Sequence, residues 1–273
     1  MLPSSHSSAR LTAMSSVRAP ANCSNNEAVV RVWHATSSSA QPGPIETYCH
    51  QWLDESECER ADRFRVMTSR NQHIVGRGMA RHLLGQSAGS AKVSPKSIEF
   101  CCLQHGKPAV KSPAEISTPF NIAHTDGLVL CGIGHAKHQL LGVDVERLER
   151  RTDPELATRY FSTPEIEYVH SFSDATRRKL AFLKVWTLKE AFIKAIGTGL
   201  NTPLSDFAFE NIDDDTPTIR MLNPELESEH QWKFFSFHPR ESFIAAIAVA
   251  TEESADHLSM HLNNFDEVVA ANS

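Results

Sequence analysis

The chain has 273 residues, of which 41% are hydrophobic and 22% are charged, and its formal net charge is −6 at pH 7. These values fit one large or two modest folded domains and exclude wholesale disorder. An acidic chain without a long Lys/Arg tract is not expected to bind nucleic acid non-specifically, because such binding needs a basic surface. No apolar stretch approaches the ~18 residues that a membrane span requires.

The first 26 residues differ in composition from the rest of the chain. They are rich in Ser, contain Arg10 and Arg18, and have no acidic residue. An organelle transit peptide has this composition, but a clear amphipathic helix is lacking. We therefore interpret residues 1–26 as a disordered N-terminal extension. A start codon set too early is a further alternative, since Met14 offers a later one.

The six cysteines of the chain form no C-x-x-C pair. A chain of this size does not need disulfide bonds to stabilise its core, so we expect reduced thiols and a cytoplasmic protein.

Secondary structure is expected to begin with a strand at residues 28–35, followed by a loop at 37–44 and a helix around 45–53. Asp54 and Glu57 then occupy the N-cap and N3 positions of a capping box, which predicts another helix start.

A longer helix is expected over residues 70–84, ended by Gly85, and a strand over 97–103 before the turn "HGKP". Three successive strands follow at "FNIAH", "LVLCGIG" and "QLLGVDVE". The first two should be antiparallel, because the short turn "TDG" joins them.

This order of elements then repeats. Ser162 or Thr163 caps a helix, a long helix covers residues 176–196, and strands follow at "FAFENI", "QWKFFSF" and "FIAAIAVA". Asp54 and Ser162 lie 108 residues apart, as do Arg70 and Arg178 near the starts of the two long helices. We therefore predict two copies of one α/β unit. The domains are an N-terminal half (27–140), a C-terminal half (141–252) and a tail (253–273).

The strand "LLGVDVERL" carries the first candidate site. Side chains alternate along a strand, so Leu141, Val143 and Val145 suit the core, and Asp144 and Glu146 project side by side with Cβ atoms roughly 6–7 Å apart. A divalent cation would relieve their repulsion and take their oxygens as ligands. Solvated acids on an exposed strand face explain D-x-E equally well, so both interpretations stay open here.

The stretch "WTLKEAFIKAIGTGL" predicts the end of the long helix, with Gly197 or Gly199 as a left-handed C-cap. Trp186, Glu190 and Lys194 share one row of this helix, away from its apolar stripe. Glu190 and Lys194 would form a helix salt bridge worth only ~0.2–0.5 kcal/mol. Alternatively, Glu190 is a third oxygen ligand and Lys194 a cation that faces phosphate, since Mg²⁺ sites combine a few carboxylates with substrate phosphates.

Two further positions suit phosphate binding. His124 closes the strand "FNIAH" just before a tight turn, where an imidazolium would donate to a phosphate oxygen. "HGKP" places Lys107 on a turn that Pro108 stiffens. A structural histidine and a solvated lysine are the alternatives.

Together, "HGKP", "FNIAHTDG", "GVDVE" and "WTLKEAFIKAIGTGL" resemble the signature of the 4′-phosphopantetheinyl transferases of the surfactin-synthetase-activating (Sfp) type. The D-x-E and W-x-x-K-E-x-x-x-K elements are the specific part, and the resemblance covers residues 28–250. It implies an α+β fold with two similar α/β halves related by a pseudo-twofold axis, with coenzyme A bound in the cleft between them.

The resemblance also implies the reaction. The 4′-phosphopantetheine arm of coenzyme A moves to a serine of an apo acyl or peptidyl carrier protein, and adenosine 3′,5′-bisphosphate is released. Asp144, Glu146 and Glu190 resemble the metal ligands of the family, for Mg²⁺, with Mn²⁺ as an alternative. We expect a monomeric holo-carrier-protein synthase, since one chain completes the cleft, with no nucleic acid or membrane as partner.

The resemblance implies a role for each residue of the helix row. Glu190 is the candidate base that accepts the serine proton, Lys194 stabilises the departing charge, and His124 contacts the phosphates of coenzyme A. Lys189 is expected to have a supporting role, and Trp186 to pack the helix.

The nucleotide end departs from the family pattern. Arg60 matches a basic position, but Glu57, His73 and Ala123 stand where a basic residue, a small polar residue and a serine are usual. Lys107 is retained and is expected near the 3′-phosphate. The residues expected to bind coenzyme A are Arg60, His73, Lys107, Pro108, His124 and Lys194.

Two other functions stay open. A metal-dependent phosphodiesterase such as a nuclease also uses D-x-E with a lysine, although the net charge argues against a nuclease. A non-catalytic protein of the same fold would bind coenzyme A or a carrier without turnover, although the intact acidic and basic positions argue against loss of catalysis.

Overall fold

The structure is a computed structural model that describes residues 29–87, 93–135, 137–252 and 255–272. The predicted N-terminal extension, residues 1–26, lies outside these ranges. No helix in the described part of the chain has both the length and the hydrophobicity that crossing a bilayer requires.

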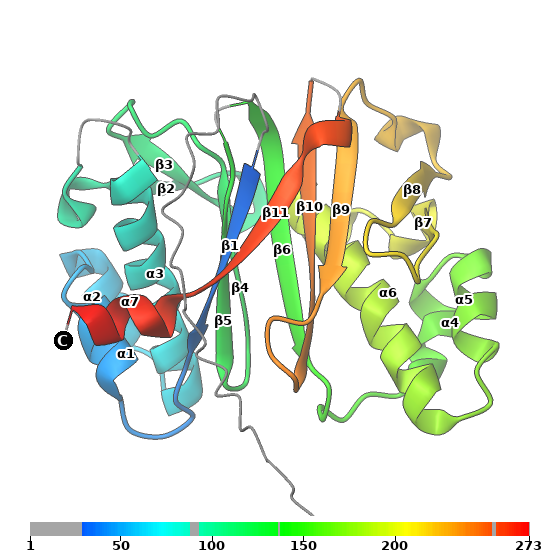
Figure 1. Ribbon diagram of the computed structural model, residues 1–273, viewed down its shortest axis with the longest axis horizontal. Helices are drawn as coiled ribbons and strands as arrows, with labels where there is room; N and C mark the ends of the chain where they lie inside the picture. The colour runs from blue at the N-terminus through cyan, green and yellow to red at the C-terminus, as the bar shows by residue number, and fades with distance from the viewer. Residues whose placement is uncertain (1–28, 88–92, 136, 253–254, 273) are drawn as a thin grey trace, which may run out of the picture.

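Two halves with the same order of elements lie side by side, with strands in the centre and helices outside (Figure 1). The first half contains β1 (Val29–Thr36), α1 (Pro44–His50), α2 (Glu55–Asp62), α3 (Met67–Ser87), β2 (Glu99–Cys102), β3 (Pro108–Ser112), β4 (Phe120–Thr125) and β5 (Leu128–Ile133). The second contains β6 (His138–Arg147), α4 (Ala157–Tyr160), α5 (Thr163–His170), α6 (Ala175–Ile196), β7 (Phe207–Glu210), β8 (Thr218–Met221), β9 (Gln231–Phe237) and β10 (Phe243–Thr251).

The strand orders of the two halves correspond. The first sheet contains β1-β5-β4 and the second β6-β10-β9, and β2-β3 and β7-β8 form one small hairpin in each half. The predicted α+β fold, with two similar halves related by a pseudo-twofold axis, is confirmed. β6 begins at His138, three residues before the boundary that we drew at residue 141, so this strand opens the second half.

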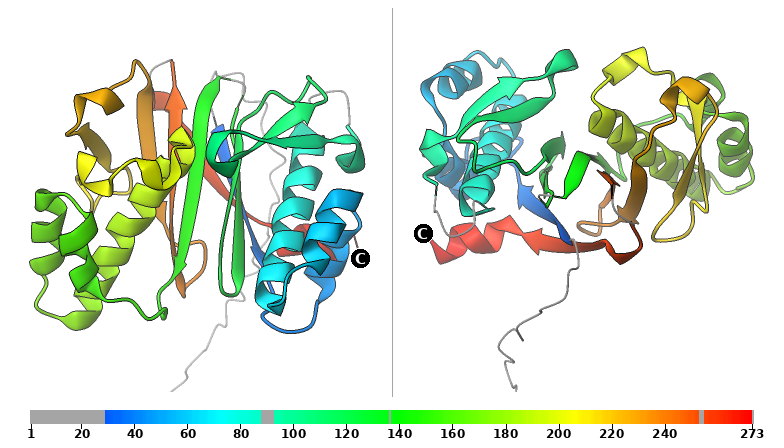
Figure 2. Two further views of the ribbon diagram at one scale, coloured as in Figure 1. Left: turned by 180° about the vertical axis from the view of Figure 1, so that it is seen from behind. Right: turned by 90° about the horizontal axis from the view of Figure 1, so that it is seen from above.

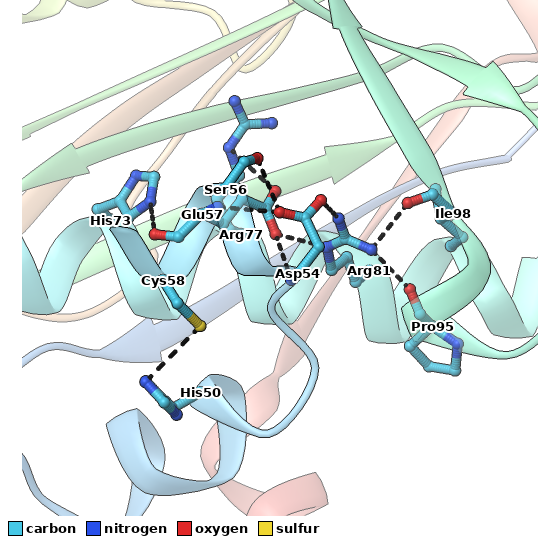
Figure 3. A network of polar contacts seen from close by, with 10 residues as sticks. All are labelled: His50, Asp54, Ser56, Glu57, Cys58, His73, Arg77, Arg81, Pro95 and Ile98. Carbon is cyan, nitrogen blue, oxygen red and sulfur yellow. Dashed lines mark hydrogen bonds and ion pairs between the residues drawn. The ribbon is translucent and has the colours of Figure 1, made fainter. Parts of the chain in front are cut away.

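A buried ionic network holds α2 against α3 in the first half (Figure 3). Asp54 and Glu57 form the predicted capping box of α2. The fully buried guanidinium of Arg81 on α3 donates to Glu57 Oε2 at 2.6 Å, to Asp54 Oδ2, and to the carbonyls of Pro95 and Ile98. Four acceptors therefore satisfy one buried cation, which burial would otherwise penalise.

The second half repeats this network 108 residues later. Ser162 and Glu165 form the capping box of α5. Lys189 Nζ on α6 lies 2.7 Å from Glu165 Oε2 and donates to the carbonyls of Leu204 and Phe207 at 2.6 and 2.7 Å. Glu165 lies 108 positions after Glu57, and Lys189 lies 108 positions after Arg81. The internal repeat is therefore present in the packing as well as in the order of elements.

The two sheets pack against each other through a shared apolar core. Its members come from β1, β4, β5, β6 and β10, and they include Val32, Leu130, Leu141, Val143, Val145 and Ile247. Asn121 on β4 also accepts a hydrogen bond from the backbone amide of Val143 on β6, at 3.0 Å, through its Oδ1. The alternation that we predicted for this strand therefore turns its apolar residues toward the first half.

Two helix ends differ in their agreement with the sequence predictions. The predicted end of α3 at Gly85 is wrong, because the helix continues to Ser87. Gly85 instead allows a close approach, since a Cβ there would lie 2.6 Å from the carbonyl oxygen of Val93. Gly197 has φ 72° and ends α6, which confirms the predicted left-handed cap.

The tail returns to the first half. After β10 the chain forms β11 (Ser259–Asn264), parallel to β1, and α7 (Phe265–Ala271). Figures 1 and 2 show this segment crossing from the second half to the helices of the first. Asp266 in the first turn of α7 accepts hydrogen bonds from Thr36 and from Arg240, so the start of this helix is attached to the rest of the protein.

Candidate active site

Strand β6 and helix α6 meet at the predicted D-x-E and Glu/Lys positions. Lys194 Nζ donates to Asp144 Oδ1 at 2.6 Å. Gly142 makes this approach possible, because a Cβ there would overlap the backbone of Ala191 and Ala195 on α6. The lysine therefore bonds across to the strand carboxylate.

Burial governs the electrostatics of the three carboxylates. It raises the pKa of Asp144, whose side chain is almost completely buried, against the opposing effect of Lys194. Burial also raises the pKa of Glu146 and Glu190. The charge of Asp144 raises both of these pKa values further, and that of Glu146 adds to the rise at Glu190. The three carboxylates are therefore close enough to repel one another, and a positive charge between them would be favoured.

The three carboxylates offer oxygen ligands that suit a divalent cation. Carboxylate oxygens are the ligands that Mg²⁺ prefers, and Asp144 Oδ2 is buried with no hydrogen-bond partner among the described residues. Glu146 is paired with Arg150, as Asp144 is with Lys194. Within the described ranges, no group of three His, Cys, Asp or Glu side chains is already arranged to hold a metal. The chemistry of the residues fits a hard cation, and their role as ligands stays a prediction.

A cavity of about 780 Å³ opens beside this junction. Glu190 and Lys194 lie on its wall, with Tyr160, Trp186 and Leu204 from the second half and Pro108 and Asn121 from the first. Its volume suits a small-molecule ligand, and most of its lining is apolar with a few polar groups. The cavity therefore requires both halves of one chain.

Sequence reasoning missed several residues of the cavity wall. Asn121, Tyr160 and Thr202 were not predicted, and only Asn121 lies within a stretch that we had singled out. Trp186 packs the helix as predicted, stacking on Phe182 with ring centroids 5.8 Å apart, and also lines the cavity. The alternation of "FNIAH" could have revealed Asn121, whereas Tyr160 and Thr202 reach the cavity through tertiary packing.

Lys107 lines the cavity, but its ammonium points to protein carbonyls. It donates to Leu141 O at 3.0 Å and to Ala195 O at 2.6 Å. Burial lowers its pKa to about 8. The ammonium of Lys107, which we expected to face solvent or a phosphate, therefore donates to backbone carbonyls in this structure.

His124 lies on β4, near the carboxylates of the site. Much of its side chain is open to solvent, and the covered remainder lowers its pKa. The charge of Lys194 lowers this pKa further, whereas Asp144 raises it. The imidazole is therefore within electrostatic reach of both, and an added anion would favour its protonation.

The nucleotide-end positions lie on α2 and α3. Arg60 is exposed. His73 Nε2 lies 3.2 Å from the carbonyl oxygen of Glu57, and burial, then the charges of Arg77 and Arg60, lower the pKa of His73 to about 4. His73 is thus neutral at pH 7. The side chain of Glu57 belongs to the Arg81 network, so this departure from the family pattern has a structural explanation (Figure 3).

The predicted residues form two neighbouring groups. One group lines the cavity and consists of Lys107, Pro108, Glu190 and Lys194. The other consists of Asp144, which bonds to Lys194, and Glu146. The charges of both carboxylates act on Glu190. The described residues that line the cavity do not include Arg60, His73 or His124.

Comparison with known proteins defines the class. Residues 140–248 match the model of the 4′-phosphopantetheinyl transferase superfamily. The chain is 33% identical over 200 residues to the 4′-phosphopantetheinyl transferase HetI of Nostoc sp., covering 72% of this chain and 78% of HetI. It is 27% identical to the 4′-phosphopantetheinyl transferase psf-1 of Bacillus pumilus, with 73% and 80% covered. It is 25% identical to Sfp of Bacillus subtilis, with 77% and 87% covered.

The chain belongs to the 4′-phosphopantetheinyl transferase family. The predicted resemblance to this family is confirmed.

Proposed function

We propose that this 4′-phosphopantetheinyl transferase moves the phosphopantetheine arm of coenzyme A to a serine of an apo acyl or peptidyl carrier protein. The observation that carries the proposal is the junction of Asp144 and Lys194, 2.6 Å apart, beside a cavity that Glu190 and Lys194 line. Family membership supplies the reaction class.

The transfer replaces the phosphoanhydride bond of coenzyme A with a phosphate ester bond to serine. The serine oxygen forms a bond to the phosphorus that bears pantetheine, the bond from that phosphorus to the bridging oxygen breaks, and adenosine 3′,5′-bisphosphate leaves. Catalysis of such a step depends mainly on positioning and on neutralising charge. A lysine on the cavity wall beside buried carboxylates supplies both.

Glu190 accepts the serine proton in this proposal. Its raised pKa makes the carboxylate a stronger base than an exposed glutamate. Lys194 leaves its contact with Asp144 to meet a phosphate oxygen as charge develops on the leaving group. His124 contacts the phosphates, with Arg60 and His73 toward the nucleotide and Lys107 and Pro108 in the cavity wall.

Asp144, Glu146 and Glu190 would hold Mg²⁺, with Mn²⁺ as an alternative, because all three offer carboxylate oxygens. A bound cation would offset the charge of the diphosphate. The support is the buried Asp144 Oδ2, to which none of the described residues forms a hydrogen bond, and the mutual repulsion of the three groups. We further propose a monomer, since both walls of the cavity come from one chain.

Intact-mass measurement tests the reaction. The protein is incubated with coenzyme A, Mg²⁺ and a panel of apo acyl and peptidyl carriers, and adenosine 3′,5′-bisphosphate is quantified in parallel. We expect one carrier to gain the phosphopantetheine mass with an equal amount of nucleotide released. EDTA should abolish transfer, and Mg²⁺ in excess should restore it. Absence of any mass gain across the panel would contradict the function, and full activity with EDTA would contradict the metal requirement alone.

A further inference from the structure

The turn between β2 and β3 is a shaped wall of the cavity. His105, Gly106, Lys107 and Pro108 line it. His105 and Gly106 both have left-handed backbone conformations, with φ 59° and 84°. The Leu103 amide donates to the Lys107 carbonyl at 2.8 Å, and the Gly106 amide donates to the Leu103 carbonyl at 3.0 Å. This turn therefore has a defined shape that directs Lys107 toward the end of α6.

Lys107 joins the first half to the second at the end of the helix that carries Glu190 and Lys194. Its ammonium donates to Ala195 O, in the last turn of α6, and to Leu141 O on β6. The last four carbonyls of a helix lack intrahelical donors, and a cation there is favoured by the helix dipole. One side chain thus satisfies the helix end and bonds to the strand that carries Asp144.

A second contact links the same two segments. The side-chain amide of Asn201 lies 3.2 Å from His105 Nδ1. Asn201 ends the short turn Gly199–Asn201 that follows α6, and Lys107 Cδ lies near Gly197, 3.4 Å from where a Cβ would stand. The β2–β3 turn therefore contacts α6 and its C-terminal continuation at two points, which we call the latch.

We propose that Lys107 is a positioning residue: it fastens the β2–β3 turn to the end of α6 and so fixes Glu190 and Lys194 relative to the first half. A direct grip on the nucleotide phosphate is the alternative, which the sequence resemblance implied. The geometry favours positioning, because two of the three ammonium donors are already used by buried carbonyls. This inference rests on the proposed function for its catalytic consequence, but not for its structural part.

The test compares Lys107→Met with Lys111→Met. Lys111 lies on the same strand, β3, and its exposed side chain pairs with Glu99 across the hairpin. Two quantities are measured: hydrogen exchange at the Gly197 amide, which donates to Ile193 O at 2.8 Å in the last turn of α6, and kcat and KM for coenzyme A. Removing a positioning group should lower kcat more than it changes KM.

We expect Lys107→Met to speed exchange at Gly197 by about 10-fold and to lower kcat by about 10-fold, with KM changed less than about 3-fold. Lys111→Met should change none of these. Asn201→Ala, which removes only the second contact, should shift exchange in the same direction by less. Circular dichroism confirms folding, and Lys107→Gln replaces the methionine variant if that one does not fold.

Two results would overturn the inference. One is unchanged exchange at Gly197 in the Lys107 variant. The other is a rise in KM of about 10-fold at constant kcat, which is the signature of lost ground-state binding. If wild-type protein transfers nothing to any carrier, the proposed function fails, whereas the exchange comparison still decides whether the latch exists.

Discussion

Asp144 and Lys194 are joined by a 2.6 Å hydrogen-bonded ion pair that links strand β6 to the long helix α6. The other carboxylate oxygen, Asp144 Oδ2, is buried, and no described residue forms a hydrogen bond to it. The site thus keeps one strong contact that a substrate phosphate would compete for, and one oxygen with unused capacity.

Replacing Asp144 or Glu190 with Ala should slow transfer by about 10²–10³-fold, because Asp144 holds Lys194 and would hold the cation, and Glu190 is the proposed base. Rates are measured as carrier modified per unit time under saturating coenzyme A and Mg²⁺. Glu149→Ala is the matched control, since Glu149 is exposed just beyond β6 and pairs with Arg147. Wild-type rates in either active-site variant would remove the proposed mechanism.

Much of the fold follows from local sequence. Local sequence signals predicted the capping boxes at Asp54 and Ser162, and both are present. They also predicted the tight turn at Gly127 and the cap at Gly197, where both glycines have φ in the left-handed range. The D-x-E strand and the Glu/Lys helix row were also readable, because alternation and helical period decide which side chains share a face.

Long-range partners were not readable. Nothing near Lys107 in the sequence indicates that its ammonium bonds to Ala195, 88 residues away. The return of β11 to β1 also depends on tertiary pairing, with Val29 opposite Ser259. Glu57 looked like a defect in nucleotide binding, and only its contact with Arg81 reveals a structural role.

The two buried networks differ in their cation and in the N-cap residue of the neighbouring helix. We predict that each cation has the number of donors that its network can accept. Arg81 uses its five-donor fork on Asp54, Glu57 and two carbonyls, whereas Lys189 uses three donors on Glu165 and two carbonyls. Lys189→Met should therefore lower the free energy of unfolding by about 3–5 kcal/mol, because it leaves Glu165 buried and uncompensated. Urea denaturation measures this loss.

A double-mutant cycle tests the match itself. Lys189→Arg alone introduces donors without acceptors, and Ser162→Asp alone introduces a carboxylate without a partner, so each should destabilise. The combined variant reproduces the Asp54–Arg81 arrangement and should recover about 0.5–3 kcal/mol relative to the sum of the two single changes. Strict additivity of the two effects would show that the halves do not use equivalent networks.

Gly142→Ala tests the contact between β6 and α6. The new Cβ would overlap the carbonyl oxygen of Ala191 and the backbone nitrogen of Ala195. Overpacking of this kind costs about 1–3 kcal/mol or more, and moving the helix away would lengthen the Lys194–Asp144 contact. We expect both stability and transfer rate to fall. Gly43→Ala, whose Cβ meets its nearest neighbour at 3.4 Å, should be close to neutral, and an equal loss in both variants would refute the argument.

Stability should fall in mild acid through His138, a residue that is only 4% exposed. Burial, then the charge of His135, lowers its pKa from 6.5 to about 4. Its Nδ1 accepts a hydrogen bond from the His135 amide at 2.8 Å, and Nε2 is buried with no hydrogen-bond partner in the part of the chain that the structure describes. The imidazolium is therefore disfavoured in the folded protein.

Between pH 6.5 and 4 the unfolded chain binds a proton at His138 that the folded protein does not, so lowering the pH favours unfolding. The stability is fully present above pH 6.5 and is lost as the pH falls toward 4, by about 2 kcal/mol at pH 5. His138→Asn cannot bind that proton, and its amide oxygen can still accept from the His135 amide. In urea denaturation at pH 7 and pH 5, the variant should lose about 2 kcal/mol less than wild type, whereas His261→Asn, at an exposed position, should lose as much as wild type. Equal losses in wild type and His138→Asn would mean that this histidine does not couple folding to pH.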